Sequence, residues 1–165
     1  MKTNLSSPRL CRSRFDGAHN TFGDFVCMAC HNYVSTDVVL SNVHNRNHCP
    51  YCLCSRHLDL YEAGDRLSAC KARMQPVALT LKRSRKKYPG ADRGELMLVH
   101  RCDECGRFSI NRIAADDDIS GLLALFESLP AIDAQTFSEL SASGILLLGP
   151  ADRSFVQRQL LGRAE

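Results

Sequence analysis

The chain has 165 residues, of which 44% are apolar and 24% charged, with a formal net charge of +3. This length suits one domain, or a small domain with an appendage, and the composition excludes a wholly disordered chain. The longest uninterrupted apolar run covers residues 122–126, whereas about 20 residues are needed to cross a bilayer. The first residues contain no apolar signal-peptide segment, so we expect a cytoplasmic protein with reduced thiols and no membrane association.

The first part of the chain is predicted to be poor in helix. Residues 1–20 contain scattered arginines without apolar periodicity, which predicts a basic disordered tail. Short apolar runs then predict strands at residues 24–26, 77–81, 95–100 and 108–110. A basic stretch and Pro89-Gly90 separate the second run from the third, which indicates an antiparallel hairpin.

The last part of the chain is predicted to be helical. Three helices are expected to begin at the Asp116-Asp117-Asp118 run, after Asp133 and at Pro150, because these residues are typical of a helix start. The predicted inward faces are Ile119, Leu122, Leu123, Phe126 and Leu129, then Phe137 and Leu140, then Phe155, Val156 and Leu160. Core packing is the expected use of these faces, and docking of a protein partner is the alternative.

Charge is distributed unevenly along the chain. Residues 116–165 carry three arginines and eight carboxylates, so residues 1–115 have a formal charge of +8. The densest basic stretch contains Lys82, Arg83, Arg85, Lys86 and Lys87. Such an asymmetry favours a polyanion as partner, and these five side chains are the candidate nucleic-acid contacts. We also expect the Asn45-Arg46-Asn47 segment to be exposed and to contribute to that basic face.

Cysteine is the unusual component, because nine residues are cysteines. Three pairs have CxxC spacing: Cys27/Cys30, Cys49/Cys52 and Cys102/Cys105. Structural zinc takes four cysteine or histidine ligands, and a CxxC turn presents two sulfurs to one ion. Eighteen residues separate Cys30 from Cys49, which suits a pair of zinc knuckles. The predicted ligands of the first zinc ion are therefore Cys27, Cys30, Cys49 and Cys52, with a redox dithiol as the alternative.

The third pair needs two more ligands to complete a second site. Cys70 is the available sulfur, and the candidates for the fourth position are His57, His48, His100 and Cys54. We choose His57, Cys70, Cys102 and Cys105, because His100 is too close to Cys102 for a regular tetrahedron and His48 adjoins the first knuckle. This choice leaves Cys54 and Cys11 outside both sites.

The segment Arg46-Asn47-His48-Cys49-Pro50 resembles the RNHCP domain family, which is named for this pentapeptide. Further motifs support the resemblance in order: Phe25–Cys30, Ser55–Asp59, Gly64–Arg66, Cys70, Met74–Pro76, His100–Gly106 and Asn111–Asp117. The resemblance covers roughly residues 20–117 and implies a small zinc-dependent domain without an established activity. Cys54 is not expected in the family, and His31 stands where a glycine is usual after a knuckle.

These observations predict an α+β fold, with a small β-rich zinc-ribbon-like domain followed by a helical C-terminal segment. The expected divisions are a basic tail at 1–20, an RNHCP-like zinc-binding domain at 21–117 and an acidic helical extension at 118–165. The leading functional hypothesis is a non-enzymatic zinc module that binds RNA or a ribonucleoprotein such as the ribosome.

Three alternatives remain open at this point. A zinc-thiol redox sensor is suggested by the extra sulfur of Cys54. A protein-interaction adaptor would act through the C-terminal helices. A metal-dependent nuclease would draw its catalytic groups from His44, Asn45, His48, His57 and Asp59.

Overall fold

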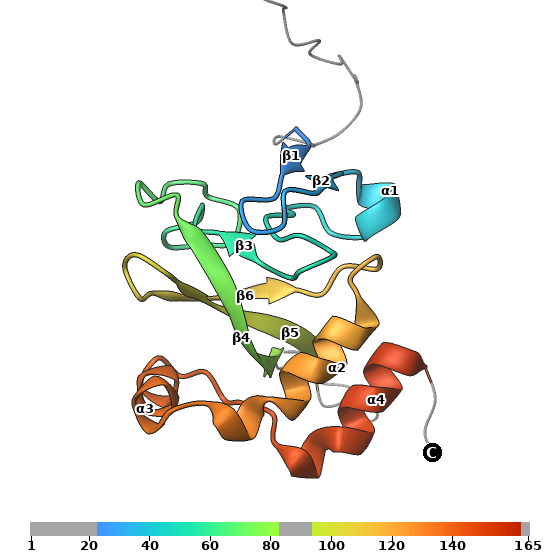
Figure 1. The fold of residues 1–165 in the computed structure, drawn as a ribbon, viewed down its shortest axis with the longest axis vertical. Helices are drawn as coiled ribbons and strands as arrows, with labels where there is room; N and C mark the ends of the chain where they lie inside the picture. Colours follow the sequence, from blue (N-terminus) through green and yellow to red (C-terminus); the bar gives the residue numbers. More distant parts are fainter. Residues whose placement is uncertain (1–22, 83–93, 163–165) are drawn as a thin grey trace, which may run out of the picture.

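The computed structural model describes residues 23–82 and 94–162 (Figure 1). The predicted tail, Cys11, and the basic residues Arg83, Arg85, Lys86 and Lys87 lie outside the described residues. Lys82 is described, as the exposed last residue of a strand. The mixture of strands and helices confirms the predicted α+β class.

Two antiparallel sheets form the first part of the molecule. The smaller one pairs β1 (Phe25–Val26) with β2 (Tyr33–Val34) and is followed by the short helix α1 (Val38–Ser41). The larger one has the order β3-β4-β5-β6, with β3 at Ser55–Arg56, β4 at Arg73–Lys82, β5 at Glu95–Cys102 and β6 at Phe108–Arg112. The expected hairpin is confirmed, because β4 and β5 pair antiparallel from Met74 with Cys102 to Lys82 with Glu95.

The C-terminal elements are helical, as expected. They are α2 (Ile119–Glu127), η1 (Leu129–Ala131), α3 (Ala134–Ala142), η2 (Pro150–Asp152) and α4 (Arg153–Leu161). Asp118 and Asp133 cap α2 and α3, because their carboxylates accept hydrogen bonds from backbone amides of the first turn. Figure 1 shows α2, η1, α3 and α4 at the end of the molecule opposite β1, β2 and α1.

One apolar core joins the large sheet to the helices. Its buried residues come from the large sheet, from helices α2 and α4, and from two loop positions, 53 and 148. They are Leu53, Leu79, Leu96, Leu98, Leu122, Phe126, Leu148, Phe155 and Val156. The stripes of α2 and α4 are thus used mainly for core packing. Two predicted inward residues are exposed instead, Ile119 at 42% and Phe137 at 53%. Helical periodicity gives the direction of an apolar face, but the tertiary packing decides which of its residues are buried.

The C-terminal segment also covers the free edge of β4. β3 pairs only with residues 73–74 of β4, so within residues 23–82 and 94–162 no strand pairs with the remainder of that edge. Pro76 lies on this stretch, where a residue without an amide hydrogen is tolerated. Further along, the amide of Leu148 donates to the carbonyl of Leu79 at 3.1 Å, and Leu147 forms an isolated bridge with Thr80. Backbone pairing therefore adds to the apolar contact between the sheet and the helical part.

Among the described residues, no helix is both long enough and apolar enough to cross a membrane.

Candidate metal centres

The three CxxC turns share one backbone pattern. In each, the amide of the first cysteine donates to the carbonyl five residues later, at 2.9 Å. The amide four residues after the first cysteine donates back to that cysteine's carbonyl, at 2.9 to 3.1 Å. This closed pattern points both sulfurs of a turn to the same side, which is the local reason that a CxxC pair acts as one bidentate unit.

The residue that follows the second cysteine has a left-handed backbone in every turn. The φ angles are +61° at His31, +60° at Leu53 and +71° at Gly106, and Lys71 after Cys70 has +54°. Glycine adopts this conformation without steric cost, whereas other residues lose on the order of 1 kcal/mol. His31 therefore occupies the usual glycine position without changing the turn geometry.

The first candidate metal centre consists of Cys27, Cys30, Cys49 and Cys52. Their four sulfurs lie within 4.8 Å of one another, with Cys27 to Cys52 at 3.5 Å and Cys30 to Cys49 at 3.6 Å. Zinc–sulfur bonds of about 2.3 Å in a tetrahedron place sulfurs about 3.8 Å apart. The spacing of the four thiols thus fits one tetrahedral metal ion.

The second candidate centre consists of His57, Cys70, Cys102 and Cys105, and its four ligand atoms also lie within 4.8 Å of one another. The sulfurs of Cys70 and Cys102 are 3.6 Å apart, and Cys105 Sγ is 3.3 Å from His57 Nδ1. Backbone hydrogen bonds hold His57 beside Cys70, because the His57 amide donates to the carbonyl of Ala72 and the His57 carbonyl accepts from the amide of Lys71. The structure therefore brings together the set chosen from spacing, with His57 in the fourth position.

The electrostatics of the first centre favour a bound cation. Burial raises the pKa of Cys49 to about 11, and it raises the pKa of Cys52 as well. Burial also opposes ionisation of Cys30, but hydrogen bonds from the Asn32 backbone and from neighbouring thiols outweigh it and lower that pKa to about 7. Four sulfurs this close together, two of them on buried residues, cannot all ionise without a compensating charge, and a divalent ion supplies that charge.

In the second centre, the pKa values of two candidate ligands, His57 and Cys102, are lowered. Burial and the positive charge of Arg107 lower the pKa of His57, which keeps its ring in the neutral form that binds metal. Burial opposes ionisation of Cys102, but backbone amides of Cys105 and Glu104 outweigh it and lower the pKa of that thiol. The donor set of three sulfurs and one imidazole fills a tetrahedral shell.

The residues before Cys49 connect the first centre to the start of α2. Arg46 is 3% exposed, and its guanidinium donates to Asp116 at 2.8 Å and to Asp117 at 3.4 Å. His48 is 1% exposed, and its Nε2 lies 2.8 Å from the same Asp117. The prediction that the Asn45-Arg46-Asn47 segment is exposed on a basic face is therefore wrong for Arg46 and Asn47. The charge of Arg46 meets carboxylates about 70 positions later in the chain, and the amide of Asn47 meets the carboxylate of Asp59.

His48 and His100, the two other histidines that the sequence offers as ligands of the second centre, support the fold. His100 is fully buried, and its ring is held between the carbonyl of Leu53, 2.7 Å from Nε2, and the amide of Asn111, 2.9 Å from Nδ1. Burial, together with the nearby His48, lowers the pKa of His100 to about 3. His100 is therefore a neutral ring in the interior.

Cys54 stands outside both ligand sets. Its carbonyl accepts a hydrogen bond from the amide of Cys49, as part of the knuckle pattern. Burial raises the pKa of its thiol, which reduces the thiolate fraction that reacts with oxidants. The extra sulfur is thus positioned by the turn.

Three of the five side chains considered for hydrolysis have structural roles. His48 is paired with Asp117, and His57 belongs to the second centre. The carboxylate of Asp59 accepts hydrogen bonds from the amides of Gly64 and Arg66, which closes a loop. With four ligands in each candidate centre, neither keeps the open position that catalytic zinc uses.

Sequence reasoning missed the role of Asp116 and Asp117. Both were assigned only to a helix N-terminus, but they bind the cation and the imidazole of the pentapeptide. The carboxylate of Asp117 additionally accepts from the amide of Ala114 at 2.7 Å. Three consecutive carboxylates were visible in the sequence, whereas their distant partners were not.

Comparison with known proteins identifies the family. No curated protein and no solved structure matches the chain. The family model of the RNHCP domain matches residues 22–123, which include both candidate centres, the large sheet and the first turns of α2. On the strength of this match over more than half of its length, the chain belongs to the RNHCP domain family.

Proposed function

We propose that this chain is a non-enzymatic zinc-binding module that binds RNA, or a ribonucleoprotein such as the ribosome, in the cytoplasm. The observation that carries the proposal is the pair of four-ligand clusters, each with sulfur spacing suited to a tetrahedral ion. Closed sets of this kind are typical of structural zinc, which can contribute on the order of 10 kcal/mol to folding. Zinc is preferred over cations that favour oxygen ligands, such as magnesium and calcium, because seven of the eight donors are thiols.

Metal analysis of ligand variants tests the zinc part of the proposal. The wild-type protein is expected to hold two zinc ions per chain, and Cys49→Ser or Cys102→Ser is expected to hold one. Cys54→Ser is the matched control, because Cys54 adjoins the first centre without belonging to it. It is expected to retain two ions. Loss of metal from the Cys54 variant, or two ions in either ligand variant, would contradict the assignment.

The RNA part of the proposal rests on where the positive charge lies. Residues 23–82 and 94–115 carry nine cationic and eight anionic side chains, which leaves a formal charge of +1. The remaining +7 of the first 115 residues belongs to residues 1–22 and 83–93. Such concentration of charge in two short stretches supports contact with phosphates through these stretches, because lysine and arginine release counterions when they bind a polyanion.

Salt-dependent binding to a short RNA hairpin with an unpaired loop tests this part. Reversal of Lys82, Arg83, Arg85, Lys86 and Lys87 to Glu is expected to abolish binding while both zinc ions are retained. The matched control exchanges Arg83, Arg85, Lys86 and Lys87 between lysine and arginine, which keeps the charge and is expected to keep most of the affinity. The logarithm of the wild-type affinity should fall with the logarithm of salt with a slope of up to about −3.5 for five contacts. An affinity that is independent of salt, or unaffected by charge reversal, would overturn the RNA proposal.

The C-terminal helices offer less for a protein partner than the sequence indicated. Leu122, Phe126, Phe155 and Val156 are buried against the sheet, so the apolar faces of α2 and α4 are already in use. An adaptor role would therefore need other residues of these helices.

A further inference from the structure

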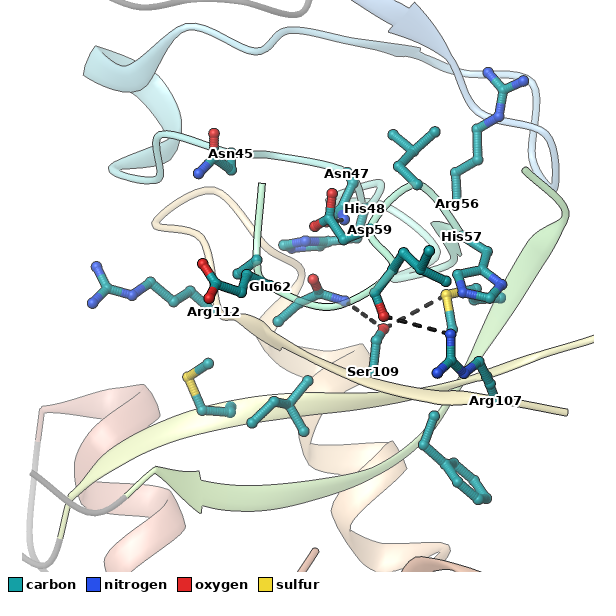
Figure 2. Close-up of a pocket in the computed structure, with 18 of the residues that line it drawn as sticks. Asn45, Asn47, His48, Arg56, His57, Asp59, Glu62, Arg107, Ser109 and Arg112 are labelled. Atoms are coloured by element: carbon teal, nitrogen blue, oxygen red, sulfur yellow. Dashed lines mark hydrogen bonds between the residues drawn. The ribbon is translucent and has the colours of Figure 1, made fainter. Parts of the chain in front are cut away.

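A cleft of about 630 Å³ lies beside the second candidate centre and is used by none of the roles described above. Three segments of the chain line most of it, at residues 43–48, 56–63 and 107–112. Figure 2 shows Asn47, His48 and Asp59 across the cleft from Ser109. The volume is within the range of small-molecule sites, about 300 to 1,000 Å³.

Two buried residues that line this cleft, Asn47 and His48, each have a polar atom without a hydrogen-bond partner among the described residues. Asn47 is 6% exposed and His48 is 1% exposed. Asn47 Oδ1 and His48 Nδ1 have no hydrogen-bond partner among the described residues. A buried polar atom without a partner destabilises the fold, so such atoms are uncommon unless they serve a ligand.

Asn47 Oδ1 is an acceptor, and His48 Nδ1 is an acceptor when the ring is neutral. Asn47 Nδ2 lies 3.5 Å from a carboxylate oxygen of Asp59, which identifies the other amide atom as the oxygen. In the tautomer of His48 that donates its Nε2 hydrogen to Asp117, the lone pair is on Nδ1. A ligand that satisfies both atoms must therefore present N–H or O–H donors.

The wall around these acceptors is held in place by backbone contacts. Asp59 accepts from the amides of Gly64 and Arg66, and Asp65 accepts from four amides of the same loop, those of Leu60, Tyr61, Glu62 and Leu67. The loop is thus ordered by its own carboxylates, which makes the cleft a preformed feature.

The remaining lining suits an aromatic heterocycle that carries an anionic group. Tyr61 is 80% exposed at the cleft and offers a stacking surface, and apolar side chains such as Leu60 and Ile110 line it as well. Four exposed cations also line it: Lys82, Arg56, Arg107 and Arg112. Arg112 is paired with Glu95 at 3.2 Å, but both side chains are about half exposed, so this contact yields readily to phosphate.

We propose that this cleft binds a nucleotide whose base carries an amino group, with the base donating to Asn47 and His48 and the phosphate facing the cations. Guanine, adenine and cytosine carry exocyclic amines, whereas uracil does not. The nucleotide can be an unpaired residue of an RNA or a free mononucleotide; the first case rests on the proposed function and deepens it.

Calorimetric titration of the zinc-loaded full-length chain tests the proposal. The probes are GMP, AMP, CMP, UMP and inorganic phosphate, together with the looped RNA hairpin and a duplex of the same stem without a loop. At least one of the amino-bearing nucleotides is expected to saturate the protein, with UMP and phosphate about tenfold weaker or worse. Uracil offers its base-edge donor only at the ring N–H, and phosphate has no base, so at least one buried acceptor is left unpaired. Saturation by phosphate with the same affinity as by every nucleotide would overturn the proposal.

Asn47→Leu separates binding from folding, because it replaces the amide by an apolar group of the same shape. It is expected to weaken nucleotide binding at least tenfold while leaving the unfolding midpoint no lower than in Gln135→Leu, a control at an exposed amide of α3 outside the cleft. Tyr61→Ala supplies a second variant, since its exposed side chain cannot support the core, and it is expected to weaken binding about fivefold. Unchanged affinity in both variants would contradict the assignment of the cleft.

The two proposals can fail separately. Mononucleotide binding without hairpin binding would support the cleft and contradict the RNA proposal. Hairpin binding that is lost on reversal of residues 82–87, yet unaffected by Asn47→Leu and unaccompanied by mononucleotide binding, would support the RNA proposal and overturn the cleft. A hairpin that binds more tightly than the duplex, with the difference lost in Asn47→Leu, would identify the RNA loop as the source of the nucleotide.

Discussion

His48 Nε2 lies 2.8 Å from the carboxylate of Asp117, although 69 positions separate the two residues in the chain. His48 immediately precedes a ligand of the first candidate metal centre, and Asp117 immediately precedes the N-cap of α2. On the same stretch, the amide of Asp118 donates to the carbonyl of Pro50 at 2.9 Å. The pentapeptide that names the family thus couples the first knuckle to the start of the helical part.

Asp117→Asn tests this coupling. The variant leaves the buried cation of Arg46 with only the partly exposed carboxylate of Asp116, and it removes the charge that faces His48. We expect the free energy of unfolding to fall by about 3 kcal/mol, as is usual when one partner of a buried pair is removed. Asp116→Asn is the matched control, because the Asp116 side chain is 36% exposed, and its cost should stay below about 1 kcal/mol. Equal losses in the two variants, measured by urea unfolding, would show that burial of the pair does not matter.

His31→Gly tests the conformational cost of the first knuckle. His31 is exposed and has a φ angle of +61°, so glycine should relieve strain and stabilise the zinc-loaded protein by about 0.5 to 1 kcal/mol.

The reverse change at the third knuckle, Gly106→Ala, provides the comparison. A Cβ at this position would meet no atom closer than 4.0 Å, so its expected cost of about 1 kcal/mol comes from the backbone alone. Thermal unfolding should therefore shift in opposite directions for the two variants, and a shift in the same direction would contradict this account.

Leu122→Ala tests whether the helices belong to the same core as the sheet. Leu122 is 1% exposed and packs in the cluster that contains Leu79 and Leu98, so its truncation should cost about 2 to 5 kcal/mol. Leu161→Ala, in α4 with 51% exposure, is the control and should cost less than about 1 kcal/mol. If the sheet and helices were independent, the sheet amides would keep their hydrogen-exchange protection in the Leu122 variant.

His100 predicts a pH dependence of stability. Its pKa in the folded protein is lowered to about 3, below the value of about 6.5 in an unfolded chain. The unfolded chain therefore takes up a proton that the folded protein refuses, and the stabilisation is complete above pH of about 6.5 and declines as pH falls. The slope approaches about 1.4 kcal/mol per pH unit between these two pKa values.

His100→Gln isolates this contribution, because glutamine can still donate to the carbonyl of Leu53 but does not titrate. The stability difference between wild type and variant should shrink as pH falls from 7 to about 5.5. Measuring the difference at each pH removes contributions that both proteins share, including proton competition for the metal. A difference that is constant over this range would mean that His100 is not held neutral by the fold.

Local pattern was sufficient for several parts of this structure. The spacing of the cysteines grouped them into two sets that do meet in space, and alternation of apolar residues located β4 and β5. Asp118 and Asp133 were recognisable as helix starts, and both cap their helices. The CxxC turns and the helix caps depend on residues close in sequence, whose geometry the backbone itself constrains.

Contacts between distant residues decided the rest. The Asn45-Arg46-Asn47 stretch predicts an exposed segment, yet Arg46 is buried against Asp116 and Asp117, and Asn47 is buried beside Asp59. Likewise, the helical spacing of Phe137 and Leu140 predicts that both face inward, whereas Leu140 is buried and Phe137 is 53% exposed. Sequence alone determined the composition of two metal-ligand sets and the unequal distribution of charge. The tertiary structure decided which charges are neutralised inside and which acceptors line a cleft, because desolvation and pairing depend on neighbours that the order of residues does not reveal.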